Sequence, residues 1–93
     1  MVVKPYHDET IIHSKFLRTF QENVDIDDLV WHQDHHDRII TILSGTNWKL
    51  QYDNSMPLLL ELEKKYYIPK NEYHRLIRGN GNLLIQIEES DVA

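Results

Sequence analysis

The hydrophobic residues that follow Leu29 fall into short runs rather than into one long period. The runs are rich in Val, Ile, Leu, Trp and Tyr, and turn residues separate them at intervals of roughly 8 to 12 positions. They are LVWHQ, RIITILSG, NWKLQYD, PLLLELE, KYYIP, EYHRLIRG and NLLIQIEE, with turn signals at Ser44-Gly45, Asp53-Asn54-Ser55 and Gly79-Asn80-Gly81. Short strands and turns at this spacing are typical of a sandwich or barrel, so we predict an all-β fold.

Before these runs, the chain has a different pattern. Residues 1–13 mix apolar and charged positions without a clear period, and we interpret them as an arm with room for a short edge strand. Ser14 is a candidate N-cap, and the segment after it would place Phe16, Leu17 and Phe20 on one side of a helix. This pattern predicts one short amphipathic helix that packs against the outside or the mouth of the barrel.

Length and composition are those of one small folded domain. The chain has 93 residues, of which 41% are hydrophobic and 10% aromatic, as is ordinary for a globular protein. It shows no internal repeat, low-complexity tract or linker. We therefore expect a single domain over residues 1–93, with an arm and helix in residues 1–28 and the barrel in residues 29–89.

Charge and residue content exclude several classes of function. No apolar run approaches the ~20 residues that cross a bilayer, and the N-terminus lacks the layout of a secretory signal, so we expect no membrane partner and a cytoplasmic location. The net charge of -5 opposes binding to nucleic acid. The chain has no cysteine, so a metal site would need nitrogen and oxygen ligands from histidines and carboxylates.

One histidine and one aspartate have the spacing of metal ligands. In an extended strand alternate side chains share a face, so His32 and Asp34 would point the same way with Cβ atoms about 7 Å apart. His74 lies in another strand-like run, directly after the turn signal Ile68-Pro69-Lys70-Asn71. Two histidines and one carboxylate that leave coordination positions open suit Fe(II) and related divalent metals. These three residues are our candidate metal site.

The same residues resemble two motifs of the cupin family. His32-Gln33-Asp34, followed after three residues by Arg38 and after six more by Gly45, resembles the first cupin motif, which has His-x-His, then Glu, then Gly. The segment 69–74, PKNEYH, resembles the second motif, Pro-x-Gly-x-x-His, with Asn71 where the family has Gly. Asn tolerates the left-handed backbone conformation that Gly serves at such a position.

The resemblance covers roughly residues 29–88 and implies a small, RmlC-like cupin, that is, a double-stranded β-helix or jelly-roll barrel. It also implies that His32, Asp34 and His74 hold a divalent ion such as Fe, Ni, Mn or Zn. Small barrels of this family commonly pair through edge strands, and the runs LVW and PLLLEL offer apolar surface for such pairing. A homodimer is therefore expected.

Arg38 is the main departure from the cupin pattern, because it stands where the family has a glutamate ligand. A guanidinium offers only hydrogen-bond donors and cannot bind a metal ion. Two arrangements stay open. The site could keep three ligands, with Arg38 turned outward or paired with Asp37, or it could be a metal-free pocket in which Arg38 receives an anion.

Each candidate residue also has an ordinary structural explanation. The two histidines of the candidate site could be half-buried residues that are hydrogen-bonded to the backbone, and Asp34 could pair with Arg38 or Arg75. His35 and His36 fall in the turn between two predicted strands, where we expect them to be exposed. The sequence does not choose between these explanations and metal binding.

Strand parity raises one further candidate. Trp48, Leu50 and Tyr52 share one face of their predicted strand, and Gln51 lies on the other face. If the polar face looked into the barrel, Gln51 would contact a ligand there, while a solvated outer face would explain it equally well. Gln51 is therefore a candidate ligand contact.

The leading functional hypothesis is a small cupin that binds a divalent metal at the three candidate residues and a small organic ligand beside it, with Arg38 and Gln51 as ligand contacts. If the protein is an enzyme, the resemblance implies an oxygenase or isomerase, and no catalytic residue is assigned. The alternative is a non-catalytic, metal-free barrel for binding or assembly, with its cavity plugged by Asp34 and Arg38. A third hypothesis is a metal-free, sugar-modifying cupin that uses His32 or His74 as a base.

Overall fold

In the computed structural model of the protein, residues 4–90 are described, and they form an almost entirely β structure. The elements are β1 (His7–Ile12), β2 (Lys15–Phe20), η1 (Ile26–Asp28), β3 (Arg38–Thr46), β4 (Lys49–Tyr52), β5 (Leu58–Leu59), β6 (Lys65–Ile68), β7 (His74–Ile77) and β8 (Asn80–Glu89). The all-β prediction is confirmed. Among residues 4–90 the single helical element is the 3-10 turn η1, and no helix there is long and apolar enough to span a membrane.

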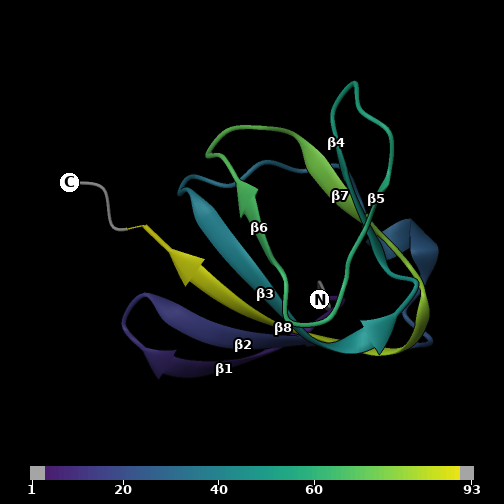
Figure 1. Cartoon of the computed structure of the whole chain (residues 1–93), viewed down its shortest axis with the longest axis horizontal. Helices are drawn as coiled ribbons and strands as arrows, with labels where there is room; N and C mark the ends of the chain where they lie inside the picture. Colours follow the sequence, from purple (N-terminus) through teal and green to yellow (C-terminus); the bar gives the residue numbers. More distant parts are fainter. Residues whose placement is uncertain (1–3, 91–93) are drawn as a thin grey trace.

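The strands form two antiparallel sheets, and each sheet joins segments that are distant in sequence. The larger sheet has the strand order β1-β2-β8-β3-β6 and the smaller one β5-β4-β7. In Figure 1 the smaller sheet lies at the upper right, and the larger sheet curves below it and to the left. β8 joins distant parts of the chain, because it pairs with β2 on one side and with β3 on the other. This is the predicted jelly-roll barrel.

The inner faces of the two sheets enclose the core. Along β3, Ile40 and Ile42 are buried while Ile39 is exposed, as strand alternation requires. Trp48, directly before β4, and Leu50 on β4 are fully buried, so of the two faces that the sequence left open it is the apolar one that points inward. The buried apolar residues are Phe20, Ile40, Ile42, Trp48, Leu50, Leu60, Ile68, Leu83, Ile85 and Ile87.

The predicted N-terminal helix is wrong, because the segment after Ser14 is strand β2. It pairs with β1 on one side and with β8 on the other, so its backbone hydrogen bonds go to other segments of the chain. Phe16 and Phe20 fit period two as well as period 3.6, with Arg18 between them on the same face. A short helix has little stability of its own, so pairing on both edges decides the outcome. The preceding arm does contain an edge strand, β1, as allowed for.

Two of the local predictions in the barrel are also wrong. Ser44-Gly45 is not a turn but lies inside β3, where the register with β8 shifts and Gly45 has a φ of 125°. This is a β-bulge, and it uses the conformational freedom of glycine to bend the strand. The run LVWHQ is not a strand, since only His32 forms an isolated bridge. The turn at Asp53-Asn54-Ser55 is confirmed, with Asn54 at a φ of 58°.

Candidate metal site

Two segments that are far apart in the sequence are joined by backbone hydrogen bonds and carry the site. His32 N donates to the carbonyl oxygen of His74 at 3.0 Å, and His74 N donates back to that of His32 at 2.9 Å. Asn71 N donates to the carbonyl oxygen of Asp34 at 2.8 Å. Lys70 N donates to Asp37 Oδ1 at 2.8 Å. These bonds bring the start of β7 next to the coil before β3.

The turn that leads into His74 has the backbone expected from the second cupin motif. Asn71 has a φ of 63°, in the left-handed region that glycine adopts freely and asparagine tolerates. The turn is closed by a hydrogen bond of 3.3 Å from Glu72 N to the carbonyl oxygen of Pro69. Asn71 therefore does here what Gly does in the motif.

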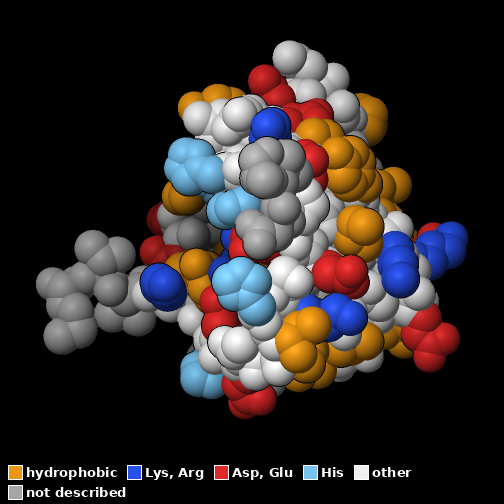
Figure 2. All heavy atoms as spheres, turned by 90° about the vertical axis from the view of Figure 1, so that its left-hand side faces the viewer, with side chains coloured by type: hydrophobic (Ala, Val, Ile, Leu, Met, Phe, Trp, Pro, Cys, Tyr) orange, Lys and Arg blue, Asp and Glu red, His pale blue; other side chains and the backbone are white. Residues whose placement is uncertain are grey.

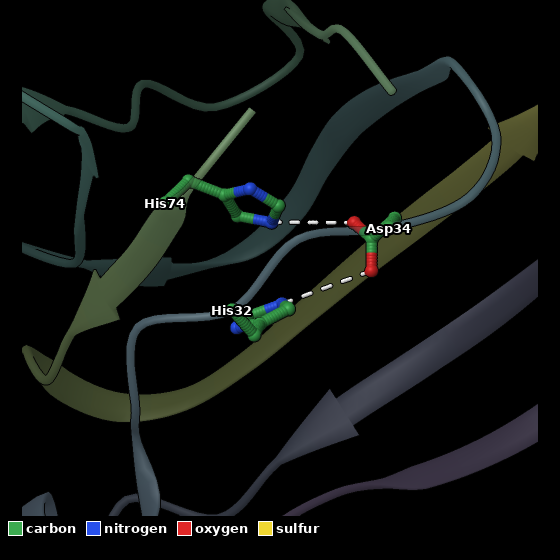
Figure 3. Close-up of side chains that lie close together, drawn as sticks. All are labelled: His32, Asp34 and His74. Carbon is green, nitrogen blue, oxygen red and sulfur yellow. Dashed lines mark ion pairs between the residues drawn. The ribbon is translucent and has the colours of Figure 1, made fainter. Parts of the chain in front are cut away.

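The structure brings His32, Asp34 and His74 together (Figure 3). Asp34 Oδ2 lies 3.3 Å from His74 Nε2, and Asp34 Oδ1 lies 3.9 Å from His32 Nε2. The centroids of the two imidazole rings are 4.3 Å apart. One ligand atom from each residue can be chosen so that all three lie within 4.8 Å of one another.

Both imidazoles are oriented for metal binding by backbone carbonyl groups. His32 Nδ1 lies 2.9 Å from the carbonyl oxygen of Val30, and His74 Nδ1 lies 2.8 Å from that of Glu72. A carbonyl oxygen only accepts, so Nδ1 carries a proton in each ring, and Nε2 offers a lone pair to an ion once it carries no proton of its own. Both Nε2 atoms face Asp34. Metal-binding histidines are commonly held in this way.

One of the ligand-atom distances already fits a first-row divalent ion, and a second is longer. Such an ion holds nitrogen and oxygen ligands at about 2.1 Å, so neighbouring ligand atoms around it are about 3.0 to 3.4 Å apart. The 3.3 Å between Asp34 and His74 is within this range, and the 3.9 Å between Asp34 and His32 is longer. The His32 side chain is 45% exposed, against 4% for His74, so it has room to close on an ion.

Asp34 is poised as a carboxylate. Burial by itself would raise the pKa of Asp34, but the contact with His74 and the positive charge of Arg38 outweigh it, and the pKa is lowered from its usual value near 3.8. Its Oδ2 atom is fully buried, and no N–H within residues 4–90 is aimed at it with hydrogen-bond geometry, although Arg38 Nη1 is 3.1 Å away. A charged, buried oxygen without an aligned donor is a suitable metal ligand.

Arg38 is held by two acidic residues. Its Nε donates to Glu89 Oε2 at 2.8 Å, its Nη2 lies 2.8 Å from the same oxygen, and its Nη1 faces Asp34 Oδ2. Arg38 is thus neither turned outward nor paired with Asp37, the arrangements that the sequence left open for a three-ligand site. Pairing with Arg38 is the ordinary structural explanation that the sequence offered for Asp34.

A cavity of about 260 Å³ adjoins the three residues. His32, Asp34, Arg38 and His74 contribute to its lining, together with apolar side chains from both sheets. On the face of the molecule that Figure 2 draws, histidine side chains (pale blue) lie near basic (blue) and acidic (red) side chains. The ion pair of Asp34 and Arg38 is present but leaves this space open, so the cavity is not plugged as the metal-free alternative supposed.

Gln51 lies outside the cavity, which corrects its expected role as a ligand contact. On β4 its neighbour Leu50 is fully buried and lines the cavity, so Gln51 points the opposite way. Its side chain accepts from Arg75 Nε at 2.9 Å and donates to the carbonyl oxygen of Ser55 at 3.0 Å. The solvated outer face explains Gln51.

The chain resembles known proteins in three-dimensional structure. No protein-family model matches the chain, and no curated protein matches its sequence. A cupin domain from Bordetella pertussis Tohama I superimposes with a TM-score of 0.65 at 14% identity, covering 97% of this chain and 98% of that one. An RmlC-like cupin family protein with a double-stranded β-helix fold from Methanocaldococcus jannaschii gives a TM-score of 0.66 at 13% identity, covering 94% and 82%. The chain has the cupin fold.

Lyases share this fold over part of their length. The DMSP lyase DddQ from Ruegeria pomeroyi DSS-3 superimposes with a TM-score of 0.68 at 14% identity, over 84% of this chain. The match spans only 38% of the lyase, and the lyase structure described as RdDddP and RnDddQII is likewise matched over 38% of its length. At this identity the likeness concerns the fold.

Sequence reasoning missed several residues around the cupin cavity. Arg18, Tyr6 and Asp28 line it, and Glu89 holds Arg38. Arg18 was missed because its segment was interpreted as a helix; a period-two interpretation would have placed it inward between two phenylalanines. For Glu89 the sequence holds no local signal, since its register with Arg38 comes from the pairing of β3 with β8.

Proposed function

We propose that this cupin binds one divalent metal ion through His32 Nε2, the Asp34 carboxylate and His74 Nε2, and that a small organic ligand occupies the adjoining cavity. The orientation of the two imidazoles is the observation that carries the proposal. Each donates Nδ1–H to a backbone carbonyl oxygen and turns Nε2 toward the same carboxylate. Two histidines that pack without a ligand role have no need to converge in this way.

Two nitrogen ligands and one oxygen ligand leave coordination positions open, as suits Fe, Ni, Mn or Zn. An ion with open positions can act as a Lewis acid on an oxygen of a bound ligand. The residues of the chain would hold the ion and form the apolar wall that excludes water from the ligand. The likeness to a DMSP lyase supports an enzymatic use of the site as part of this proposal, with no catalytic residue assigned.

A second candidate function is a metal-free binding barrel. The contact of 3.1 Å between Arg38 Nη1 and Asp34 Oδ2 favours it, because a guanidinium near the carboxylate competes with a cation. The open cavity would then bind a ligand without an ion.

Protein purified without a histidine tag is dialysed against Fe, Ni, Mn and Zn in turn, and bound metal is measured by mass spectrometry. We expect about one ion per chain in the wild type, and an affinity lower by about 10- to 100-fold or more in the His32→Ala/His74→Ala double variant. The matched control is His35→Ala/His36→Ala, since both residues are exposed in the neighbouring turn, as expected from the sequence. Circular dichroism verifies that each variant is folded.

Equal metal content in the wild type and in the His32→Ala/His74→Ala variant would end the metal proposal and leave the metal-free barrel. Loss of metal in the control alone would assign the binding to exposed histidines rather than to the candidate site. A rise in melting temperature on adding metal, seen in the wild type and the control but absent from the site variant, is the second expected result.

A further inference from the structure

We propose, on the basis of the metal site proposed above, that the ligand in the cavity is a small monocarboxylate with an apolar body, that its carboxylate pairs with Arg38, and that it binds more tightly when the metal site is loaded. The proposal follows from the composition of the cavity wall, the unused donors of Arg38, and the position of Asp34 between the ion and the guanidinium.

The cavity wall favours an apolar body of modest size. Six aliphatic side chains from both sheets line it: Ile40, Leu50, Ile68, Leu76, Ile85 and Ile87. Its volume of about 260 Å³ lies below the range of roughly 300 to 1,000 Å³ that holds drug-sized ligands. Beside this wall, His32, Arg38 and His74 gather around Asp34, so a ligand with one charged end and one apolar end matches both parts.

Arg38 keeps hydrogen-bond donors for such a charged end. A guanidinium has five N–H groups, and Glu89 receives Nε and Nη2 on a single oxygen. Nη1 lies 3.1 Å from Asp34 Oδ2, yet that oxygen receives no aligned hydrogen bond from residues 4–90. The remaining N–H groups are therefore left for a planar carboxylate, for which the guanidinium fork is well shaped.

The other arginine that lines the cavity pairs with Asp8 and not with a candidate metal ligand. Arg18 donates from Nε and Nη2 to the two carboxylate oxygens of Asp8, at 2.8 and 3.0 Å, and its guanidinium carbon lies 3.5 Å from the centroid of the Tyr6 ring. Of the two arginines that line the cavity, Arg38 is the one in contact with a candidate metal ligand, Asp34. This places the carboxylate end of the ligand at the metal site and the apolar body against the aliphatic wall.

Asp34 couples the two binding events. Without a cation, the negative charge of Asp34 lies beside Arg38 and opposes a second anion there. When Asp34 binds a divalent ion, the ion offsets the negative charge of Asp34. Glu89 is then the acidic partner that Arg38 keeps. An anion then meets a more positive site. By thermodynamic reciprocity, the carboxylate must raise the metal affinity by the same factor.

The test is calorimetric titration of the full chain, with and without saturating Zn²⁺. The probes are hexanoate, hexanamide, which has the same body without the charge, and inorganic phosphate, which has charge without the body. We expect hexanoate to bind about tenfold more tightly than the other two, and Zn²⁺ to raise its affinity by about tenfold.

Arg38→Gln should remove both the preference for hexanoate and the gain in affinity on adding Zn²⁺. The control Arg75→Gln should keep them, since Arg75 contacts Gln51 and the Trp31 ring on the outer face.

Each other result has a defined meaning. If hexanoate binds Zn²⁺-loaded Arg38→Gln as tightly as wild type, the ion alone holds the carboxylate and the inference is overturned. If hexanamide or phosphate matches hexanoate, the charged end or the apolar body has been wrongly assigned. Titration of Zn²⁺ alone tests the metal site separately, so a protein that binds Zn²⁺ but no hexanoate overturns this inference and leaves the proposed function standing.

Discussion

At the scale of single residues, Asp34 has the most demanding position in the molecule. Its two oxygens face His32, His74 and Arg38, yet none of the described N–H groups is aligned on the buried Oδ2. A buried carboxylate usually has aligned donors, because leaving it without them costs free energy. The site is therefore built around a charge whose best partner is a cation, which is why both proposals depend on Asp34.

Tyr52 offers a test of how the two sheets are held together. Its hydroxyl donates to the carbonyl oxygen of Tyr67, which joins β4 of the smaller sheet to β6 at the edge of the larger one. We predict that Tyr52→Phe lowers the free energy of unfolding by about 1 kcal/mol, the usual net value of one neutral hydrogen bond. Urea denaturation measures it. Tyr73→Phe is the control, since Tyr73 is exposed, and an equal loss there would contradict the prediction.

The same hydroxyl predicts a dependence on pH. Burial, with a contribution from Glu72, raises the pKa of Tyr52 above its ordinary value of 10.0. The folded protein thus keeps the Tyr52 proton at a pH where the unfolded chain loses it, so stability should fall as the pH rises above about 10. Comparing the urea midpoints of wild type and Tyr52→Phe between neutral and alkaline pH measures this. A constant difference between them across that range would show that Tyr52 does not contribute.

At the scale of elements, the connection between β7 and β8 depends on a close approach of two backbones. A Cβ atom on Gly79 would lie 2.3 Å from the carbonyl oxygen of Thr46 and 2.4 Å from the backbone nitrogen of Trp48. Neither backbone can move without disturbing the buried Trp48, whose Nε1 donates to the carbonyl oxygen of Gly81 at 3.0 Å. Gly79 therefore serves packing between strands, whereas the sequence suggested only a turn.

We predict that Gly79→Ala destabilises the protein by about 4 kcal/mol or prevents folding, because a backbone clash in a packed site is among the most costly changes. Gly81→Ala is the matched control. Its Cβ would meet no atom within 4 Å, and only its φ of 68° opposes a side chain, at a cost of about 1 kcal/mol. Thermal unfolding followed by circular dichroism compares the two. Similar melting temperatures for both variants would contradict the close approach.

At the scale of the whole molecule, the apolar surface predicts pairing of two chains. Both runs that the sequence singled out for this role carry exposed apolar side chains: Val30, Trp31, Leu58, Leu59 and Leu62. β5 is an edge strand of the smaller sheet and leaves backbone groups free to pair. We predict a homodimer at micromolar concentration, measured by size-exclusion chromatography with light scattering, and a shift toward monomer in Leu62→Glu. A monomer mass for the wild type would contradict it.

Sequence alone determined whatever depends on neighbouring residues. Alternation of apolar and polar positions is a local property, so it predicted the barrel strands and placed Trp48 and Leu50 on one shared face. The left-handed turn at Asn71 follows from the chemistry of one side chain. The parity of His32 and Asp34 needs only a short stretch of extended chain, and their spacing matched a known motif. These local signals were sufficient for the all-β fold and for naming the candidate ligands.

Only the tertiary structure decided what depends on contacts between distant segments. Pairing on both edges made residues 15–20 a strand although their pattern also fits a helix. The register of β3 with β8 placed Glu89 on Arg38, and the sheet's orientation turned Gln51 outward. His74 reaches His32 through backbone hydrogen bonds across 42 positions of sequence. Such contacts depend on which strands pair and in which register, and the free energy of that choice is shared by the whole barrel rather than carried by any short segment.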